Sequence, residues 1–247
     1  MSRFVTDAVL FVGHRGGRGD TWPTENTLLA FERARLSGVT AIELDVREAA
    51  DGVVVFHDAT LARLACDKDP RLASGLSLSE LARIELSKGG AIPSLAEILE
   101  WADAHDVSLN IELKRDVPSR VSLVSNVANA VAKRSGDYLF SSFDPAIVAM
   151  LAARAPKVRR ALLTAKNQKS AAPLHTLSRK AWLDGVNLER TQTDPQLIAM
   201  LRARGLGVGV WTVNEVVEAR GLIAAGVNWI ISDEAMALKA STSPPDV

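Results

Sequence analysis

Short runs of β-branched and apolar residues alternate with longer amphipathic stretches along the chain, and this alternation limits the fold more than any other feature. Most of the short runs, which predict strands, are followed by a helical pattern, as at 27–36 and 195–204. Such alternation is typical of parallel βα units. The predicted strands cover 9–12, 41–46, 53–57, 108–114, 138–142, 160–164, 185–188, 207–213 and 229–232.

The second and third predicted strands are too close together for a parallel crossover. Only residues 47–52 separate them, whereas a crossover needs roughly a dozen residues. Asp51-Gly52 supplies a turn signal, so we expect an antiparallel hairpin. Without the returning arm, eight parallel strands remain in 247 residues, which is the usual size of a (β/α)8 TIM barrel. An open doubly wound sheet fits this α/β pattern less well.

The chain contains no Pro/Gly/Ser-rich linker that would divide it, so we expect a single domain over residues 1–240. The irregular stretch 59–91 follows the hairpin and predicts a short insertion over one end of the barrel. A short helix inside it would begin at an N-cap, either Ser77 or Ser79. Residues 241–247 have the composition of a flexible tail.

Composition excludes several classes of protein. Lys+Arg and Asp+Glu each number 29, so a neutral chain lacks the basic field that holds nucleic acid. The single cysteine, Cys66, cannot form an internal disulfide. The sequence has no transmembrane stretch and no long apolar run typical of a signal peptide. We therefore expect a cytoplasmic protein without membrane insertion, whose oligomeric state the sequence does not determine.

Carboxylates lie near the carboxyl ends of two predicted strands. Strand side chains alternate between faces, so Glu43 and Asp45 share one face. The same alternation puts Asn110, Glu112 and Lys114 on one face of a later strand. The alternative is that these polar residues simply face solvent, but acidic residues are uncommon in strands and costly when buried unpaired. Oxygen ligands at the catalytic end of a barrel suit Mg²⁺ or Ca²⁺.

Two histidines also lie at predicted strand ends. His14 ends the first strand, and His57 ends the returning arm of the hairpin. A turn centred on residues 50–51 would put His57 opposite Leu44 or Asp45 and so bring it to the carboxylate pair. Imidazoles titrate near neutral pH, so a pair of histidines beside a phosphate suits general acid and base catalysis.

Cations accompany these histidines. Arg15 and Lys114 are suited to neutralise phosphate oxygens. Each histidine taken alone has a simpler explanation as a hydrogen-bonded residue at a strand terminus. His105 and His175 are assigned no chemistry, because the sequence places one at a helix end and the other in a loop-like segment.

Taken together and in order, these residues resemble the glycerophosphodiester phosphodiesterase family. Each short motif is weak alone, but the ordered set spans most of the chain. The matching segments are His14-Arg15-Gly16, Glu25-Asn26-Thr27, Glu43-Leu44-Asp45, His57-Asp58, Glu112-Leu113-Lys114, Ser141-Ser142-Phe143 and Trp211-Thr212-Val213-Asn214.

The resemblance implies a barrel hydrolase of lipid and glycerol metabolism. Such an enzyme converts a small-molecule glycerophosphodiester, for example a deacylated phospholipid, to sn-glycerol 3-phosphate and an alcohol. It also implies a divalent metal. By position, the resemblance implies that Glu43, Asp45 and Glu112 are the metal ligands. It implies that His14 and His57 are the acid and the base, but it does not indicate which histidine has which role. The family expectation is a cyclic phosphate that water then opens.

The resemblance further implies a set of substrate-binding residues. Arg15 and Lys114 would bind the phosphate oxygens. Glu25 and Asn26 would be support residues near the mouth of the site. Trp211 is either barrel packing or a cover over the glycerol or head group, and the motif match favours the cover. Phe143 has the same two interpretations.

Three features depart from the family pattern. Thr24 is an extra residue between the proline and Glu25, which alters the entry of that loop. The insertion 59–91 is short, which leaves the cleft more open. The last strand ends in Ser232, where a threonine is common, and keeps a hydroxyl.

Other functions compete with this one. A related barrel phosphodiesterase could act on lysophospholipids or sphingolipids, but the chain has no evident basic amphipathic helix for a membrane surface. A non-catalytic barrel that binds phosphorylated ligands would be expected to have lost a histidine or a carboxylate. An amidohydrolase fits worse, because His14 lacks a second histidine ligand two residues away.

Overall fold

The structure, a computed structural model, describes residues 2–6, 8–165 and 182–242. Their strands form one sheet with the order β1-β9-β8-β7-β6-β5-β4-β2-β3, and a further pairing of β1 with β2 closes it. The strands are β1 (Leu10–His14), β2 (Ala41–Glu48), β3 (Val53–Val55), β4 (Ser108–Leu113), β5 (Tyr138–Ser142), β6 (Arg159–Leu163), β7 (Gly185–Glu189), β8 (Gly207–Trp211) and β9 (Trp229–Ser232).

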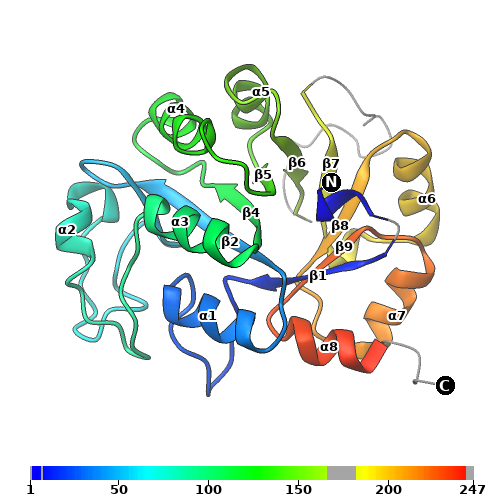
Figure 1. The fold of residues 1–247 in the computed structure, drawn as a ribbon, viewed down its shortest axis with the longest axis horizontal. Helices are drawn as coiled ribbons and strands as arrows, with labels where there is room; N and C mark the ends of the chain where they lie inside the picture. Colours follow the sequence, from blue (N-terminus) through cyan, green and yellow to red (C-terminus); the bar gives the residue numbers. More distant parts are fainter. Residues whose placement is uncertain (1, 7, 166–181, 243–247) are drawn as a thin grey trace.

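Eight of these strands run parallel around a closed barrel, and β3 alone pairs antiparallel, with β2. Helices surround the strands, with α2 standing apart at one side (Figure 1). The predicted (β/α)8 TIM barrel is therefore confirmed. The helices are α1 (Leu28–Leu36), α2 (Leu78–Leu81), α3 (Leu95–His105), α4 (Arg120–Val131), α5 (Pro145–Arg154), α6 (Pro195–Ala203), α7 (Val216–Ala224) and α8 (Ala235–Thr242), with 3-10 turns η1 (Arg3–Val5), η2 (Ala73–Gly75) and η4 (Arg190–Gln192).

Local sequence explains where the helices begin. Thr27 caps α1 by accepting a hydrogen bond from the Ala30 amide. Helices α5 and α6 each begin with an Asp-Pro pair, in which the aspartate caps the helix and the proline occupies its first turn. These signals are visible in the sequence, and they account for the agreement between the predicted and observed helices at 27–36 and 195–204.

The hairpin places His57 at the carboxyl end of the barrel, as the sequence predicts. Val46 pairs with Val55, and the Phe56 amide donates to the Asp45 carbonyl at 3.0 Å. Continuing this register puts His57 opposite Leu44, one of the two predicted partners. The regular strand β3 ends at Val55, two residues earlier than predicted.

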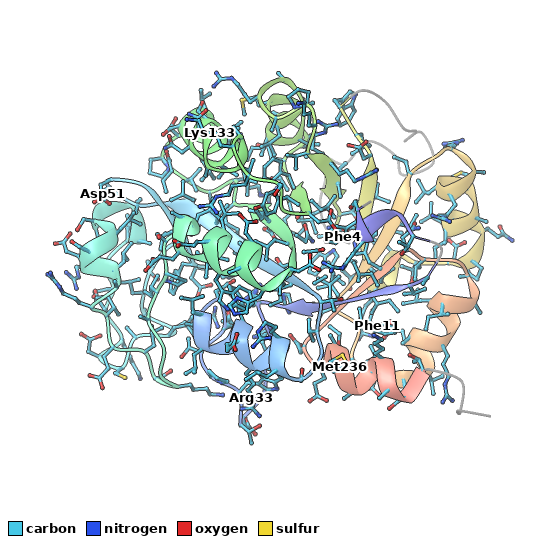
Figure 2. The ribbon with its side chains drawn as sticks, viewed as in Figure 1. Phe4, Phe11, Arg33, Asp51, Lys133 and Met236 are labelled. Carbon is cyan, nitrogen blue, oxygen red and sulfur yellow. The ribbon has the colours of Figure 1, made fainter. Side chains whose placement is uncertain are left out.

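Two apolar layers stabilise the barrel. The outer layer lies between strands and helices and contains Ile42 and Leu44, so the opposite faces predicted for β2 are confirmed. Figure 2 places Phe4 within the ring of strands and Phe11 near β1 and α8. The inner layer comprises Phe4, Val12, Ala41, Leu139, Ala161, Trp229 and Ile231.

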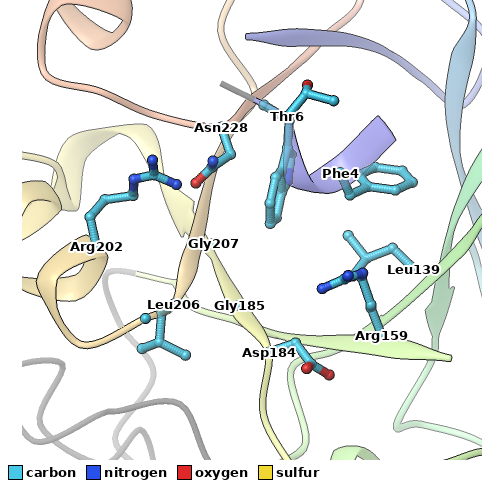
Figure 3. A pocket seen from close by; sticks show the side chains of 12 residues that line it. Phe4, Thr6, Leu139, Arg159, Asp184, Gly185, Arg202, Leu206, Gly207 and Asn228 are labelled. Carbon is cyan, nitrogen blue, oxygen red and sulfur yellow. The ribbon is translucent and has the colours of Figure 1, made fainter. Parts of the chain in front are cut away.

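The Trp229 indole fills the barrel interior because β8 contributes glycine there. A Cβ at Gly209 would lie 1.8 Å from Trp229 Nε1, and one at Gly207 would lie 2.8 Å from the same ring. A pocket at this amino end of the barrel is lined by Phe4, Arg159 and Trp229 among others (Figure 3). Trp229 thus closes the barrel below the polar residues described next.

The insertion 59–91 has a small core of its own, which includes Leu61, Leu81 and Leu86. Its helix α2 begins at Ser77, one of the two predicted caps, in a capping box with Glu80. No helix among residues 2–6, 8–165 and 182–242 is long and apolar enough to cross a membrane. Helix α8 includes residues 241–242 of the predicted tail, and the rest of that tail lies outside the described residues, as does His175.

Candidate active site

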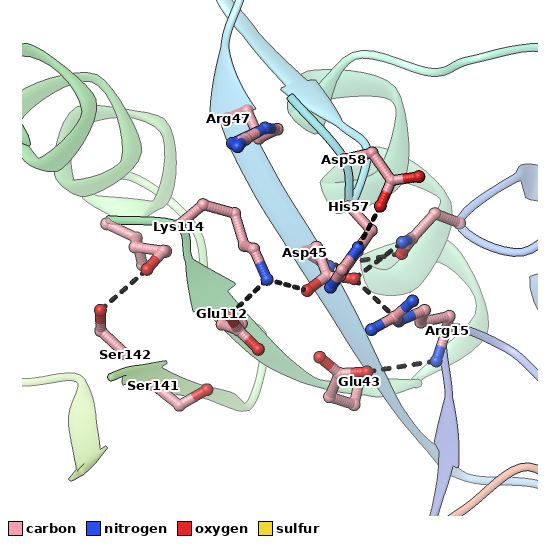
Figure 4. Close-up of polar contacts among 12 residues, drawn as sticks. Arg15, Glu43, Asp45, Arg47, His57, Asp58, Glu112, Lys114, Ser141 and Ser142 are labelled. Carbon is pink, nitrogen blue, oxygen red and sulfur yellow. Dashed lines mark hydrogen bonds and ion pairs between the residues drawn. The ribbon is translucent and has the colours of Figure 1, made fainter. Parts of the chain in front are cut away.

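The carboxylates of Glu43, Asp45 and Glu112 meet at the carboxyl end of the barrel. One oxygen from each lies within 4.8 Å of the others, and all three side chains are buried. They meet because β2 and β4 are neighbours in register, with Asp45 paired to Glu112. Figure 4 shows them between Arg15 and Lys114. Hard oxygen ligands in this number and spacing fit Mg²⁺ or Ca²⁺.

Two cations pair with this cluster. Lys114 Nζ lies 2.8 Å from Glu112 and 3.3 Å from Asp45. Arg15 Nε lies 3.0 Å from the other oxygen of Asp45, and the Arg15 backbone amide donates to Glu43 at 3.2 Å. Asp45 therefore has a cation at each oxygen, whereas neither Arg15 nor Lys114 forms a side-chain ion pair with Glu43 in the described part of the chain.

This difference separates the pKa values of two neighbouring carboxyls. Burial opposes ionisation of Asp45, but the attraction of Arg15 and Lys114 outweighs it and holds the pKa of Asp45 well below its usual range. Burial, followed by repulsion from Asp45, raises the pKa of Glu43 well above its usual range. If all three carboxyls were ionised, the cluster would carry more negative charge than Arg15 and Lys114 neutralise, and a bound divalent cation would stabilise that ionised form.

His14 is buried and held by a carboxylate from the last turn of the barrel. Its Nδ1 lies 2.7 Å from Asp233 Oδ1, and Asn214 Nδ2 donates to the other Asp233 oxygen at 2.8 Å. An ionised carboxylate only accepts, so Nδ1 carries the proton and Nε2 is directed elsewhere. Nε2 lies 3.9 Å from Glu43. Burial lowers the pKa of His14 despite the raising effect of Asp233.

His57 has a matching arrangement. Its Nδ1 lies 2.6 Å from Asp58 Oδ1, while Arg63 Nε donates to Asp58 Oδ2 at 2.5 Å. Burial would raise the pKa of Asp58, but the hydrogen bonds from His57 and Arg63 hold it well below its usual range. The ionised carboxylate therefore fixes the His57 proton on Nδ1 as well. The His57 side chain is 31% exposed against 9% for His14, so it lies nearer the mouth.

Glu25 and Asn26 form hydrogen bonds with charged side chains of the protein. Asn26 Nδ2 donates to Asp45 Oδ2 at 2.9 Å. Glu25 is buried and accepts from Arg15 at 2.8 Å and from Arg63 at 2.7 Å. Both side chains thus contact charged residues of the site, Asp45 in one case and Arg15 in the other.

One pocket is lined by most of the predicted site residues, whereas Glu25 lines a separate pocket. His14, Arg15, Glu43, His57, Glu112 and Lys114 all line the first pocket, together with Phe143 and Trp211. The two aromatic rings are 5.5 Å apart in an edge-to-face arrangement, and the Trp211 indole donates to the Asn187 carbonyl at 3.2 Å. They form an apolar wall opposite the charged residues. Asp45 and Asn26 lie behind the lining.

Sequence reasoning missed four residues that hold the histidines, directly or through a carboxylate. Asn214 was part of a matched motif and Asp233 follows Ser232, but no role was predicted for either residue. Asp58 was part of a matched motif, and its spacing of one residue from His57 was the available signal. Arg63 lies in the irregular insertion, where no periodicity marks it.

The chain is similar to known proteins over most of its length. Residues 14–237 match the family model of the Glycerophosphoryl diester phosphodiesterase family. The chain is 30% identical over 236 residues to the uncharacterized protein YqiK of Bacillus subtilis, covering 89% of this chain and 93% of that protein. It is 28% identical over 241 residues to the glycerophosphodiester phosphodiesterase of Caldanaerobacter subterraneus subsp. tengcongensis, covering 91% and 94%.

Solved structures share the barrel. A glycerophosphodiester phosphodiesterase from Agrobacterium tumefaciens is 25% identical with a TM-score of 0.76, covering 94% of this chain and 100% of that one. A phosphodiesterase from Oleispira antarctica, in complex with the product sn-glycerol-3-phosphate, is 23% identical with a TM-score of 0.80, covering 94% and 96%. The second likeness bears on the fold alone.

Proposed function

From the premise that the chain belongs to the glycerophosphoryl diester phosphodiesterase family, and is a phosphoric diester hydrolase, we propose that it hydrolyses glycerophosphodiesters to sn-glycerol 3-phosphate and an alcohol. One observation carries this proposal most directly. Two carboxylate-held histidines and two cations line one pocket with the acidic cluster. The Oleispira antarctica phosphodiesterase, which shares the barrel, is itself in complex with the product sn-glycerol-3-phosphate.

Glu43, Asp45 and Glu112 are the residues that would hold a divalent metal ion. The spacing of their oxygens and the raised pKa of Glu43, caused by burial and by Asp45, support this assignment. When bound, such an ion supplies Lewis-acid polarisation of the phosphate and neutralises charge. Arg15 and Lys114 line the same pocket and bind phosphate oxygens.

Burial and position support different roles for the two histidines. His14 is the more buried, and its lowered pKa, caused by burial, keeps Nε2 free to accept a proton near neutral pH. It takes the proton of the glycerol hydroxyl next to the phosphoester as that oxygen attacks phosphorus. His57, nearer the mouth, acts as the imidazolium: Nδ1–H stays hydrogen-bonded to Asp58, and the second proton passes from Nε2 to the departing alcohol oxygen.

The first half of the reaction leaves a cyclic glycerol phosphate. In the second half a water attacks phosphorus and the ring P–O bond breaks. The histidines exchange roles, so His57 accepts a proton from water and His14 returns one to the glycerol oxygen. Phe143 and Trp211 cover the apolar side of the bound glycerol group.

An assay of purified protein tests this function. Glycerophosphocholine and glycerophosphoethanolamine are incubated with Mg²⁺, with Ca²⁺ and with EDTA, and the release of glycerol 3-phosphate is measured. Release with metal and its loss in EDTA are expected. No release with either metal from folded protein contradicts the proposal, and a lysolipid assay would follow. The His14→Ala and His57→Ala variants should each lose about 10²–10⁴-fold in turnover.

A further inference from the structure

Arg63 lies outside the barrel strands, yet its guanidinium joins two groups of the candidate site. Nε donates to Asp58 Oδ2 at 2.5 Å, and Nη2 donates to Glu25 Oε1 at 2.7 Å. Asp58 holds His57, and Glu25 holds Arg15. Among the described residues, a chain of charged contacts therefore runs from His57 through Arg63 to the Arg15 that pairs with Asp45.

The insertion fixes where Arg63 lies. Leu61, two residues earlier, is completely buried in the small core of this segment. The amides of Leu64 and Ala65 both donate to the Leu61 carbonyl, at 3.1 and 3.0 Å, and close a turn around Arg63. The Arg63 side chain is 42% exposed, so its backbone is anchored while its guanidinium reaches the pocket mouth.

The Asp58 carboxylate is divided between two partners. Oδ1 accepts a hydrogen bond from His57 Nδ1, and Oδ2 accepts one from Arg63 Nε. A carboxylate bound at one oxygen only can turn about its side-chain bonds, and the imidazole would turn with it. The planar fork of an arginine binds two carboxylates in fixed directions, which a lysine cannot do with its single ammonium.

We propose that Arg63 is a positioning residue for His57, so that the insertion segment 59–91 sets the efficiency of proton transfer to the departing alcohol. This inference rests on the proposed function, in which His57 is the acid. It predicts that loss of Arg63 lowers kcat while KM for the diester changes little, because Arg63 reaches the reaction through Asp58 and does not bind substrate.

The test compares Arg63→Met with Arg71→Met. Arg71 is a matched control, since it belongs to the same segment and pairs with Asp69 at 2.6 Å, away from the site. With glycerophosphocholine, Arg63→Met should lose about 10–100-fold in kcat, the range for residues that orient a catalytic group. Arg71→Met should retain wild-type kcat. Arg63→Lys keeps the positive charge, which helps folding, and its kcat should lie between those of the wild type and Arg63→Met.

A second substrate separates positioning from general damage. Glycerol 3-(p-nitrophenyl phosphate) releases nitrophenolate, a good leaving group that needs no proton. If Arg63 acts through the acid His57, the kcat of Arg63→Met and Arg63→Lys should fall much less with this substrate than with glycerophosphocholine. Melting temperatures of all variants show whether folding is intact.

Two results overturn the inference. One is wild-type kcat in Arg63→Met, and the other is an equal loss on both substrates for the folded Arg63→Lys variant. Absence of glycerol 3-phosphate release by the wild-type protein itself contradicts the proposed function instead, and the two failures are thereby distinguished.

Discussion

His14 Nδ1 lies 2.7 Å from Asp233 Oδ1, although the two residues are 219 positions apart. His14 ends β1 and Asp233 follows β9, and these two strands, the first and the last along the chain, pair with each other in the closed barrel. Closure of the fold therefore builds one of the two histidine–carboxylate pairs. Asn214, which follows β8, holds the second oxygen of Asp233 at 2.8 Å.

Replacing this carboxylate should impair the proposed base. Asp233→Asn can donate to His14 Nδ1, which would move the ring proton to Nε2, the atom that must accept. We expect a loss of about 10²–10⁴-fold in kcat for glycerol 3-phosphate release. The exposed neighbour Glu234 supplies the control, because Glu234→Gln makes the same charge change without touching His14. Equal activity of the two variants would contradict the role of Asp233.

The pH dependence of kcat/KM should reflect the lowered pKa of His14. A base acts when neutral, and burial keeps His14 neutral at a lower pH than an ordinary imidazole. The acid limb of the profile should therefore lie below about pH 6.5, the ordinary histidine value. A pH–rate series at saturating metal measures it. An acid limb clearly above that value would show that another group controls proton removal.

Glu43 should destabilise the protein when no metal is bound. Its pKa is raised, first by burial and then by Asp45, so its contribution to stability is present in acid and is lost as pH rises through the raised pKa. At pH 8, Glu43→Gln without metal should melt higher than the wild type. Each 1 kcal/mol corresponds to about 2–4 °C in a chain of this size.

The same variant tests the metal site. Mg²⁺ or Ca²⁺ should raise the melting temperature of the wild type, EDTA should reverse this, and Glu43→Gln should respond much less. Glu100→Gln, on the exposed side of α3, is the control and should behave as wild type in both conditions. An identical metal response in Glu43→Gln and wild type would place the ion elsewhere.

The close approach of β8 to Trp229 should make Gly209 intolerant of any side chain. A Cβ there would lie 1.8 Å from the indole Nε1, so Gly209→Ala must shift the ring or the strand. We expect a loss of about 1–3 kcal/mol in the free energy of unfolding, measured by urea denaturation.

A glycine in a helix provides the opposite case. Nothing lies within 4 Å of a Cβ at Gly221 in α7, so Gly221→Ala should stabilise the protein by about 1 kcal/mol or less. If both variants destabilise equally, the close packing of Trp229 is not the cause.

The barrel could be predicted because its signals are local. Strand runs, the helical patterns at 27–36 and 195–204 and the short 47–52 connection each act within a few residues, and each agreed with the structure. Strand ends were less well predicted, and β8 stops at Trp211, before the predicted 213. Strand ends depend on neighbouring strands, which local sequence does not specify.

Much of the site was also predictable, for a different reason. Alternation along β2 put Glu43 and Asp45 on one face, and the same rule placed Glu112. What the sequence did not indicate was which carboxylate would have an uncompensated charge. That depends on Arg15 and Lys114, which both pair with Asp45, and on the burial of Glu43.

Local sequence specifies the order of strands and helices, the hairpin, and which chemical groups lie at the barrel end, because periodicity and turn chemistry act over short distances. Which groups hold the histidines depends instead on how distant segments pack together. Asp233 meets His14 because the barrel closes, and Arg63 meets Asp58 and Glu25 because the insertion packs beside the mouth. Contacts between distant segments depend on packing of the whole chain, and so do the pKa values that they set.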